Sequence, residues 1–343
     1  MTAYLKGVCG HLPDKVVTND DLVRANPDWD SEKIFERTGI RSRRVASDNE
    51  TASDLGFHAA DKLLKSLNVD RSLIDALLFC TQTPDYLCPA SACLLQTRLE
   101  LPTTCAAFDY NLGCSGFVYG LWLARALVDS QSSRNVLVVV GDTCSKLCNP
   151  HDMTTTVLFG DGGGAALISA NPDGAIGTLG PSIVGTDGRG AENLIVPVGA
   201  ARNPRTATSS EIRTDDKGNQ RSDEQFFMNG VEVFNFSLKL VVPGVMQLLE
   251  RCGLSTSDID LFLFHQANAF MLERLRKKMN IPIEKMPVVL EHTGNTSCAT
   301  IPLLMQHCQE KSLLKPGDKC VLAGFGVGYS WAFSLLQWGG SPS

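Results

Sequence analysis

The sequence predicts an α/β fold built from two duplicated halves. Apolar segments of strand length alternate with segments of helical periodicity along most of the chain, which is typical of α/β proteins. In addition, residues 259–265 repeat the pattern of residues 74–80, and Gly294-Asn295 repeats Gly113-Cys114. Because the matched segments follow one another in the same order, we interpret residues 1–180 and 181–343 as two copies of one unit.

The first half begins with a strand predicted at residues 4–9, and Thr18 is suited to cap the helix that follows it. Helices are expected at residues 52–67 and 90–99, with a buried strand at 74–80 and a loop at 84–89 between them. Residues 105–108 read as a second buried strand, which leads through a tight turn at 111–113 into a helix at 117–127. The β-branched run at 136–140 predicts a strand covered on both faces.

The middle of the chain contains a glycine-rich segment and a polar one. Residues 157–168 are expected to form two strands joined by a glycine bend, which we interpret as structural because no phosphate-binding GK[ST] motif follows it. Residues 186–225 are rich in Gly, Pro, Ser and Arg and predict a long surface excursion. The second half then repeats the first, with strands at 259–265 and 320–324 and a helix at 299–307.

Composition excludes several classes of function. The net charge of −6 gives no indication of a nucleic-acid-binding surface. The N-terminus does not resemble a signal peptide, and no apolar run approaches membrane-spanning length, so we expect no membrane partner. Twelve scattered cysteines, several of them inside apolar strands, indicate a reduced cytoplasmic protein. Cys144 and Cys148 lack zinc-ligand spacing, so no metal site is expected.

Cys114 lies where the predicted strand at 105–108 turns into the helix at 117–127. At the first turn of a helix, free backbone N–H groups and the helix dipole lower a thiol pKa. Gly113 and Gly116 are expected to leave the sulfur approachable. This setting predicts a nucleophile, although a buried structural cysteine is the commoner role for this residue type.

Four arginines fall within eight residues, at Arg37, Arg41, Arg43 and Arg44. Guanidinium groups bind phosphates well, so this segment is a candidate anion-binding rim. A solvated loop is an equally good interpretation.

His265 and Asn295 occupy loops that match, in the second half, the positions around the nucleophile candidate. If the halves face each other across a pseudo-two-fold axis, Cys114, His265 and Asn295 converge. An imidazole and a carboxamide are two neutral donors that can both bind one thioester oxygen and stabilise an enolate. A thiol nucleophile beside such a pair is suited to joining two acyl groups.

These motifs resemble one known family. The Gly-Cys-Ser-Gly turn at Cys114, the His-Gln-Ala-Asn run from His265 to Asn268, the Gly-Asn-Thr-Ser run at Asn295 and the Phe-Gly-Val-Gly run at Phe325 are similar to β-ketoacyl-acyl-carrier-protein synthase III of the thiolase superfamily. So are residues 37–41 and 158–162. The resemblance covers nearly the whole chain, and it implies a thiolase-like five-layer αβαβα fold and a homodimer.

The resemblance also implies a reaction and its site residues. Cys114 would take an acyl group from a thioester, and His265 and Asn295 would then promote loss of CO₂ from a malonyl thioester. The carbanion would attack the acyl group on Cys114, with the backbone N–H groups of Cys114 and Val327 holding the oxyanion and Phe325 packing beside the catalytic groups. Arg37, Asn268 and Cys88 would contact substrate, Cys88 from the partner subunit. Acyl-coenzyme A, acyl carrier protein and malonyl carrier protein would be substrates, with no separate cofactor.

Departures from the family pattern concern the carriers of the acyl groups. Lys33 and Met153 replace the tryptophan and arginine that many members stack on the coenzyme A adenine, and Ala269-Phe270 replaces Leu-Arg after the His-Gln-Ala-Asn run. We therefore expect weak coenzyme A binding and a role in a specialised pathway. Arg274 and Lys278 share a face of the helix after His265 and are predicted to dock an acidic carrier protein.

Other interpretations remain open at this point. A chalcone-synthase-like enzyme is usually longer and lacks the His-Gln-Ala-Asn run. A thiolase would need a second cysteine near Phe325, and a 3-hydroxy-3-methylglutaryl synthase would need a catalytic glutamate near residue 80. A non-condensing acyltransferase, which moves the acyl group from Cys114 to an alcohol or amine, is compatible with the same motifs.

Overall fold

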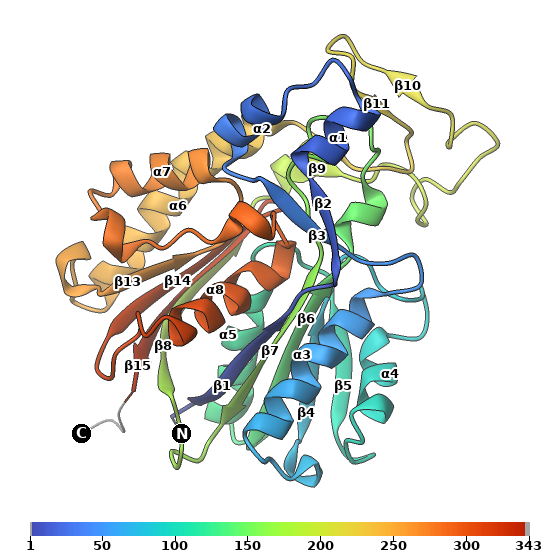
Figure 1. Ribbon diagram of the computed structural model, residues 1–343. Coiled ribbons are helices and arrows are strands. Elements are labelled where there is room, and N and C mark those ends of the chain that lie inside the picture. Colours follow the sequence, from blue (N-terminus) through green and yellow to red (C-terminus); the bar gives the residue numbers. More distant parts are fainter. Residues whose placement is uncertain (1, 340–343) are drawn as a thin grey trace.

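The computed structural model describes residues 2–339 and contains one mixed nine-stranded sheet (Figure 1). Across the sheet the strands follow the order β13-β14-β15-β8-β1-β7-β6-β4-β5. They are β1 (Tyr4–His11), β4 (Ala76–Cys80), β5 (Ala106–Tyr110), β6 (Asn135–Asp142), β7 (Gly162–Ser169), β8 (Gly177–Thr186), β13 (Leu261–Phe264), β14 (Lys319–Gly326) and β15 (Ser330–Trp338).

The strand order repeats on the two sides of the sheet centre. From the centre outward, the first side runs β1-β7-β6-β4 and the second runs β8-β15-β14-β13. The parallel pair β4–β6 corresponds to β13–β14, and the antiparallel pair β6–β7 corresponds to β14–β15. This order is what two copies of one unit would produce. The division predicted at residue 180 falls inside β8, so the second copy would begin a few residues earlier, at the start of this strand. The division into two copies remains a prediction.

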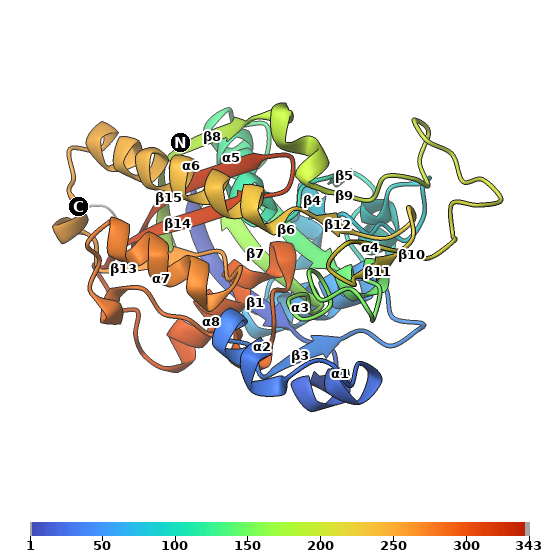
Figure 2. The ribbon, with the colours of Figure 1, turned by 90° about the horizontal axis from the view of Figure 1, so that it is seen from above.

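Some helices lie between the two sides of the sheet and others cover the outer face of each side. The fold therefore has the five layers that were predicted (Figures 1 and 2). Two helices, α5 (Gly116–Asp129) and α8 (Thr300–Glu310), contact strands of both sides and form the middle layer. The outer face of the first side is covered by α3 (Ala52–Ser66) and α4 (Ser91–Arg98), and that of the second side by α6 (Gly230–Arg251) and α7 (Ala269–Lys278). The arrangement is the thiolase-like αβαβα fold.

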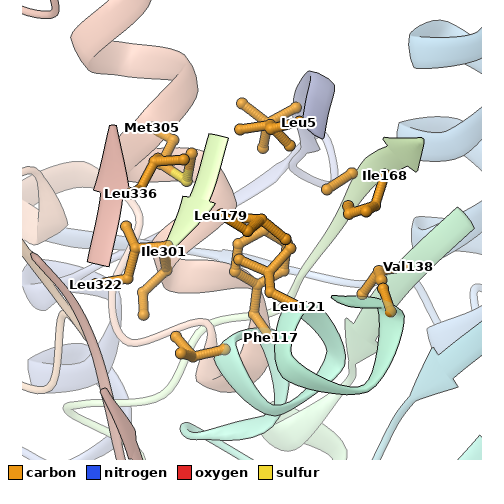
Figure 3. Close-up of a cluster of buried hydrophobic side chains, with 14 of the residues drawn as sticks. Leu5, Phe117, Leu121, Val138, Ile168, Leu179, Ile301, Met305, Leu322 and Leu336 are labelled. Atoms are coloured by element: carbon orange, nitrogen blue, oxygen red, sulfur yellow. The ribbon is translucent and has the colours of Figure 1, made fainter. Parts of the chain in front are cut away.

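The largest hydrophobic core surrounds the middle layer (Figure 3). Phe117 and Leu121 of α5 and Ile301 and Met305 of α8 are all buried there, against strands of both halves such as β6 and β14. Burying one such side chain completely contributes about 1.5–3 kcal/mol. The two helices that carry the nucleophile turn and the Asn295 loop are therefore fixed to the same core.

Smaller elements gather beyond one end of the sheet, at the top of Figure 1. The hairpin of β2 (Lys15–Thr18) and β3 (Ser42–Val45) accompanies α1 (Asn19–Ala25), which Thr18 caps as predicted, and α2 (Ser31–Thr38). Residues 186–225 are the expected surface excursion. They contain short strands, β9 (Leu194–Ile195), β10 (Arg213–Thr214) and β11 (Gln220–Arg221), and β12 (Phe227–Met228) follows. Short 3₁₀ helices include η2 (Cys144–Leu147), η6 (Leu290–His292) and η7 (Ser297–Ala299).

Three expectations about individual elements are wrong. The strand predicted at 105–108 is β5, an edge strand that pairs only with β4 and leaves Phe108 44% exposed. Residues 157–158 lie in a turn that hydrogen bonds to the Thr155 carbonyl close, and Phe159 makes only an isolated bridge to Asn295, so no strand forms here. The glycine bend after them is structural as expected, since a Cβ on Gly160 would lie 2.3 Å from the Thr293 carbonyl oxygen.

The third correction concerns α6. Within residues 2–339 it is the one helix that is long and apolar enough, by length and composition, to cross a membrane. No run of that length was expected from the sequence. However, Phe236, Val241, Val245 and Leu248 are buried in the core cluster of the second half, where α6 packs on β14 and β15. One face of α6 therefore packs on this core, while 28% of its most apolar window is buried.

Candidate active site

Cys114 follows the turn after β5, one residue before Ser115, which is the N-cap of α5. The flanking glycines are required by close packing: a Cβ on Gly116 would lie 2.2 Å from Cys80 Sγ, and one on Gly113 would lie 2.1 Å from Gln82 Oε1. The glycine that faces the sulfur is Gly326, where an added Cβ would lie 3.0 Å from Cys114 Sγ. Access to the nucleophile therefore depends on Gly326, and the role predicted for Gly113 and Gly116 stays a prediction.

The thiol of Cys114 is buried, with 7% of the residue exposed. Burial, reinforced by the nearby Asp142 carboxylate, raises the pKa of Cys114 to about 12. The sequence predicted a lowered pKa from the helix terminus. That prediction is wrong because Cys114 precedes the N-cap and because the loss of hydration outweighs the helix dipole. Another group must take up the thiol proton when the sulfur attacks.

His265 directly follows β13, and its backbone N–H donates to the Ala323 carbonyl of β14 at 2.8 Å. Its ring is held by a 2.7 Å hydrogen bond between Nδ1 and the Thr300 hydroxyl. Burial lowers the pKa of His265 to about 3. The imidazole is therefore neutral at physiological pH, as the sequence-based role requires.

Asn295 is clamped by the turn at residues 157–160. Its backbone N–H donates to the Leu158 carbonyl at 2.8 Å, and its carbonyl accepts from the Gly160 N–H at 3.0 Å. The side-chain Oδ1 accepts from the Ser297 backbone N–H at 2.9 Å. Because the oxygen is engaged in this way, the amide nitrogen is the end of the carboxamide that can donate to a ligand.

Cys114, His265 and Asn295 line one cavity of about 150 Å³, so the convergence expected from the repeat is observed. Phe325 and Gly326 also line it, and the Phe325 ring stands edge-on to the imidazole, with centroids 5.7 Å apart. The remaining wall is mostly apolar and is formed by residues such as Leu158, Phe159, Leu194, Met228, Val233 and Met271. An apolar wall strengthens the electrostatic effect of the few donors inside it.

A second cavity adjoins the first, because Leu158 and Asn268 line both. Asn268 also caps α7 by accepting from the Met271 backbone N–H at 2.8 Å. Lys33, Arg37 and Met153 line the second cavity, and so does Trp29, which the sequence did not indicate. Trp29 adds an aromatic surface to this cavity four residues before Lys33, and the weak coenzyme A binding expected from Lys33 and Met153 stays a prediction.

The other arginines of the predicted anion-binding rim have different roles. Arg43 is fully buried and donates to Asn19 Oδ1 and to the backbone carbonyls of Val17 and Val157. Arg41 pairs with Glu32 and Glu291 on the surface. Of the four, Arg37 alone lines the second cavity.

Several predicted site residues lie outside both cavities. Cys88 is exposed in the loop at 84–89, beside Leu87, which is 93% exposed. Val327 follows Gly326 at the end of β14 but does not itself line the cavity. Arg274 and Lys278 are exposed on α7, and no group of three potential metal ligands occurs in the part of the chain that the structure describes.

A thiolase-like fold that brings a cysteine, a neutral histidine and an asparagine into one apolar cavity defines a thiol-dependent condensing enzyme, which is an acyltransferase. Comparisons with known proteins identify the particular family. Residues 108–188 match the family model described as 3-oxoacyl-[acyl-carrier-protein (ACP)] synthase III, and residues 249–338 match the model of its C-terminal part. The chain belongs to the β-ketoacyl-[acyl-carrier-protein] synthase III family.

Individual relatives match over nearly their full length. The β-ketoacyl-[acyl-carrier-protein] synthase III of Caldanaerobacter subterraneus subsp. tengcongensis is 38% identical, over 98% of both chains. A crystal structure of a 3-oxoacyl-(acyl-carrier-protein) synthase III is 47% identical, with a TM-score of 0.95 over 98% of this chain and 100% of the other. That of the synthase from Burkholderia xenovorans LB400 is 41% identical, with a TM-score of 0.90 over 99% and 95%.

Proposed function

We propose that the protein forms a 3-oxoacyl thioester by decarboxylative condensation of an acyl group with a malonyl group carried by acyl carrier protein. The observation that carries the proposal is the placement of Cys114, His265 and Asn295 on one apolar cavity. The sulfur attacks the primer thioester, and the thiol carrier leaves. Loss of CO₂ from the malonyl thioester then produces an enolate, whose carbon attacks the acyl group and releases Cys114.

His265 and Asn295 serve the second half of this reaction. Two neutral donors on the malonyl thioester oxygen stabilise the negative charge that develops as CO₂ leaves. For this role the imidazole carries its proton on Nε2, which requires the Thr300 hydroxyl to donate to Nδ1 instead of to the Ser297 carbonyl, 3.0 Å away. Phe325 limits the space beside the ring, and the backbone N–H groups of Cys114 and Val327 hold the oxyanion during attack on the acyl group.

The products distinguish condensation from simple acyl transfer. Purified protein is given octanoyl-coenzyme A and malonyl carrier protein whose free carboxyl is labelled with ¹³C. Condensation releases labelled CO₂ and leaves a carrier-bound 3-oxo chain two carbons longer than the primer. Transfer to an alcohol or amine without release of CO₂ would establish the non-condensing alternative.

The working form is proposed to be a homodimer in the cytoplasm. Strand β5 lies at the edge of the sheet, and its Phe108 side chain is exposed. The loop at 84–89 beside this edge exposes two more apolar side chains, Tyr86 and Leu87. An unprotected edge with exposed apolar side chains is suited to pairing with a second copy. All twelve cysteines are free thiols, which suits a reducing compartment.

In that dimer, Cys88 would reach the partner's acyl cavity and widen it. Replacing Cys88 by phenylalanine should shift the preferred primer toward acetyl, because the larger side chain would fill space that a longer primer occupies. Each additional CH₂ buried in that space contributes about 0.8 kcal/mol of binding free energy. The measurement is kcat/KM for acetyl-, butyryl- and octanoyl-coenzyme A. The control is Cys93→Phe, which changes another exposed cysteine, on α4. Unchanged chain-length preference in Cys88→Phe would refute this placement.

The carrier protein is proposed to dock on α7. In the structure Arg276 and Lys277 pair with Glu273, whereas Arg274 and Lys278 have no acidic partner within residues 2–339. Arg274 instead covers the exposed Phe270 ring, 5.0 Å from its centroid. Lys278 donates to the Leu238 carbonyl at 3.1 Å, and with Arg274 over the exposed Phe270 ring it forms a cationic surface that complements an acidic partner.

Reversing these charges should weaken catalysis with carrier-bound substrates. For Arg274→Glu with Lys278→Glu we expect at least a roughly tenfold rise in KM for malonyl carrier protein at low ionic strength, and a smaller rise at high salt because ions screen the interaction. Acylation of Cys114 by acyl-coenzyme A should not change. The charge-matched control is Lys311→Glu with Lys315→Glu, which changes two exposed lysines between α8 and β14. Equal effects of the two double variants would rule out α7 as the docking helix.

A further inference from the structure

Asp142 is a buried carboxylate behind the nucleophile whose role the condensation mechanism leaves unassigned. It ends β6 and is fully buried. The Gln82 N–H and the Thr81 hydroxyl donate to Oδ1 at 2.7 and 3.2 Å, but Oδ2 has no hydrogen-bond partner in the described residues. Buried polar atoms are normally paired, so an unpaired carboxylate oxygen beside an active site requires an explanation.

Ser297 presents the complementary feature. Its hydroxyl is also buried without a hydrogen-bond partner among residues 2–339. It lies close to both the Cys114 thiol and the Asp142 carboxyl, and this proximity lowers the pKa of each group. The 3₁₀ helix η7 that begins with Ser297 packs against β6 and α5, the two elements that position Asp142 and Cys114.

The backbone at Ser297 supports a functional role. Its φ of +52° lies in the left-handed region that non-glycine residues rarely adopt. This conformation accompanies the hydrogen bond from the Ser297 N–H to Asn295 Oδ1 and leaves the hydroxyl beside the thiol and the carboxylate. Unfavourable backbone conformations of this kind are concentrated at functional sites.

We propose that Asp142, acting through the Ser297 hydroxyl, is the base that takes the proton of Cys114 when the sulfur attacks the primer thioester. The proposal rests on the proposed function and assigns a step that it leaves open. Cys114 passes its proton to Ser297 Oγ while Ser297 passes its own proton to Asp142 Oδ2. As the sulfur–carbon bond forms and the bond to the thiol carrier breaks, the proton returns by the same route to the departing thiolate.

The other polar groups of the site are less suited to this step. Burial keeps the pKa of His265 at about 3, which makes the imidazole a weak base, and Asn295 cannot accept a proton from a thiol. Burial raises the pKa of Asp142, so its carboxylate is a stronger base than an exposed one. The titratable groups around it are Cys114, Cys144, Cys298 and Asp161, none of which is a cation.

Asp161 provides a matched control for Asp142. It is equally buried, but both of its oxygens accept hydrogen bonds, from Ser145 and from the Ala46 N–H. Asp161→Asn therefore removes a buried carboxylate of the same kind without touching the nucleophile. Asp142→Glu retains the base and should restore part of the activity lost in Asp142→Asn.

The test is the rate of acylation of Cys114, followed by intact mass after mixing with octanoyl-coenzyme A between about pH 6 and pH 9. In Asp142→Asn and in Ser297→Ala we expect acylation at neutral pH to be slower by about a hundredfold, within the range for loss of a general base. In both variants the rate should rise about tenfold per pH unit, because hydroxide must then remove the proton. The parent profile should level off once Asp142 is ionised.

Both outcomes of the test are decisive. If Ser297→Ala and Asp142→Asn acylate at the parental rate with the parental pH profile, or if Asp161→Asn loses as much activity as Asp142→Asn, the relay is wrong. Ser297→Ala removes a single oxygen and should fold, so the relay can still be tested with this variant if Asp142→Asn does not fold. A parent protein that is never acylated at Cys114 would instead contradict the proposed function.

Discussion

Replacing Cys114 by alanine should abolish acyl transfer completely while leaving the fold intact. The sulfur is the atom that carries the acyl group between the two half-reactions, and alanine has no group that can replace it. The side chain is small and lies on a cavity, so the fold should lose little. Intact mass spectrometry after incubation with octanoyl-coenzyme A should show the acyl mass on the parent protein and none on Cys114→Ala.

The control for this experiment is Cys144→Ala, which removes another buried thiol near the nucleophile. That variant should be acylated like the parent. Should Cys114→Ala still gain the acyl mass, a different cysteine would be the nucleophile, and peptide mapping would locate it among the others.

Replacing His265 or Asn295 by alanine should slow release of CO₂ from malonyl carrier protein by roughly 10²–10³-fold, the range observed when one donor to a developing oxyanion is removed. Acylation of Cys114 should continue in both variants, because neither side chain is needed to form the acyl-enzyme. The two half-reactions can be measured separately, acylation by intact mass and decarboxylation by release of labelled CO₂.

His292→Ala is a suitable control, because His292 is exposed on the segment that leads to Asn295 but does not line the cavity. Decarboxylation at the parental rate in His265→Ala or Asn295→Ala would remove that residue from the mechanism. Loss of acylation together with decarboxylation would assign the residue to the first half-reaction instead.

The fold and the three central side chains could be predicted because both depend on local patterns. Continuous apolar runs such as residues 136–140 indicate buried strands. His265 directly follows β13, which corresponds to β4, and Cys114 and Asn295 precede the two helices of the middle layer, α5 and α8. Once the order of matched elements suggests duplication, the convergence of their loops follows from symmetry. No long-range contact has to be known in advance.

The features that the sequence did not predict depend on contacts between distant segments. Trp29 lines the second cavity because α1, α2 and residues 150–158 pack together, and no pattern around Trp29 indicates that packing. The raised pKa of Cys114 comes from burial and from Asp142, which is distant in the sequence. Similarly, the exposure of β5 depends on its position at the sheet edge, which its apolar composition does not reveal.

The central claim is that Cys114 carries an acyl group which a malonyl thioester then removes by condensation. The most direct test is to acylate the protein with octanoyl-coenzyme A, remove the free thioester, add malonyl carrier protein and follow the intact mass. We predict that the acyl mass on Cys114 disappears as one equivalent of CO₂ and one equivalent of 3-oxodecanoyl carrier protein form. An acyl-enzyme that persists, or that loses its acyl group to water, an alcohol or an amine without release of CO₂, would contradict the account.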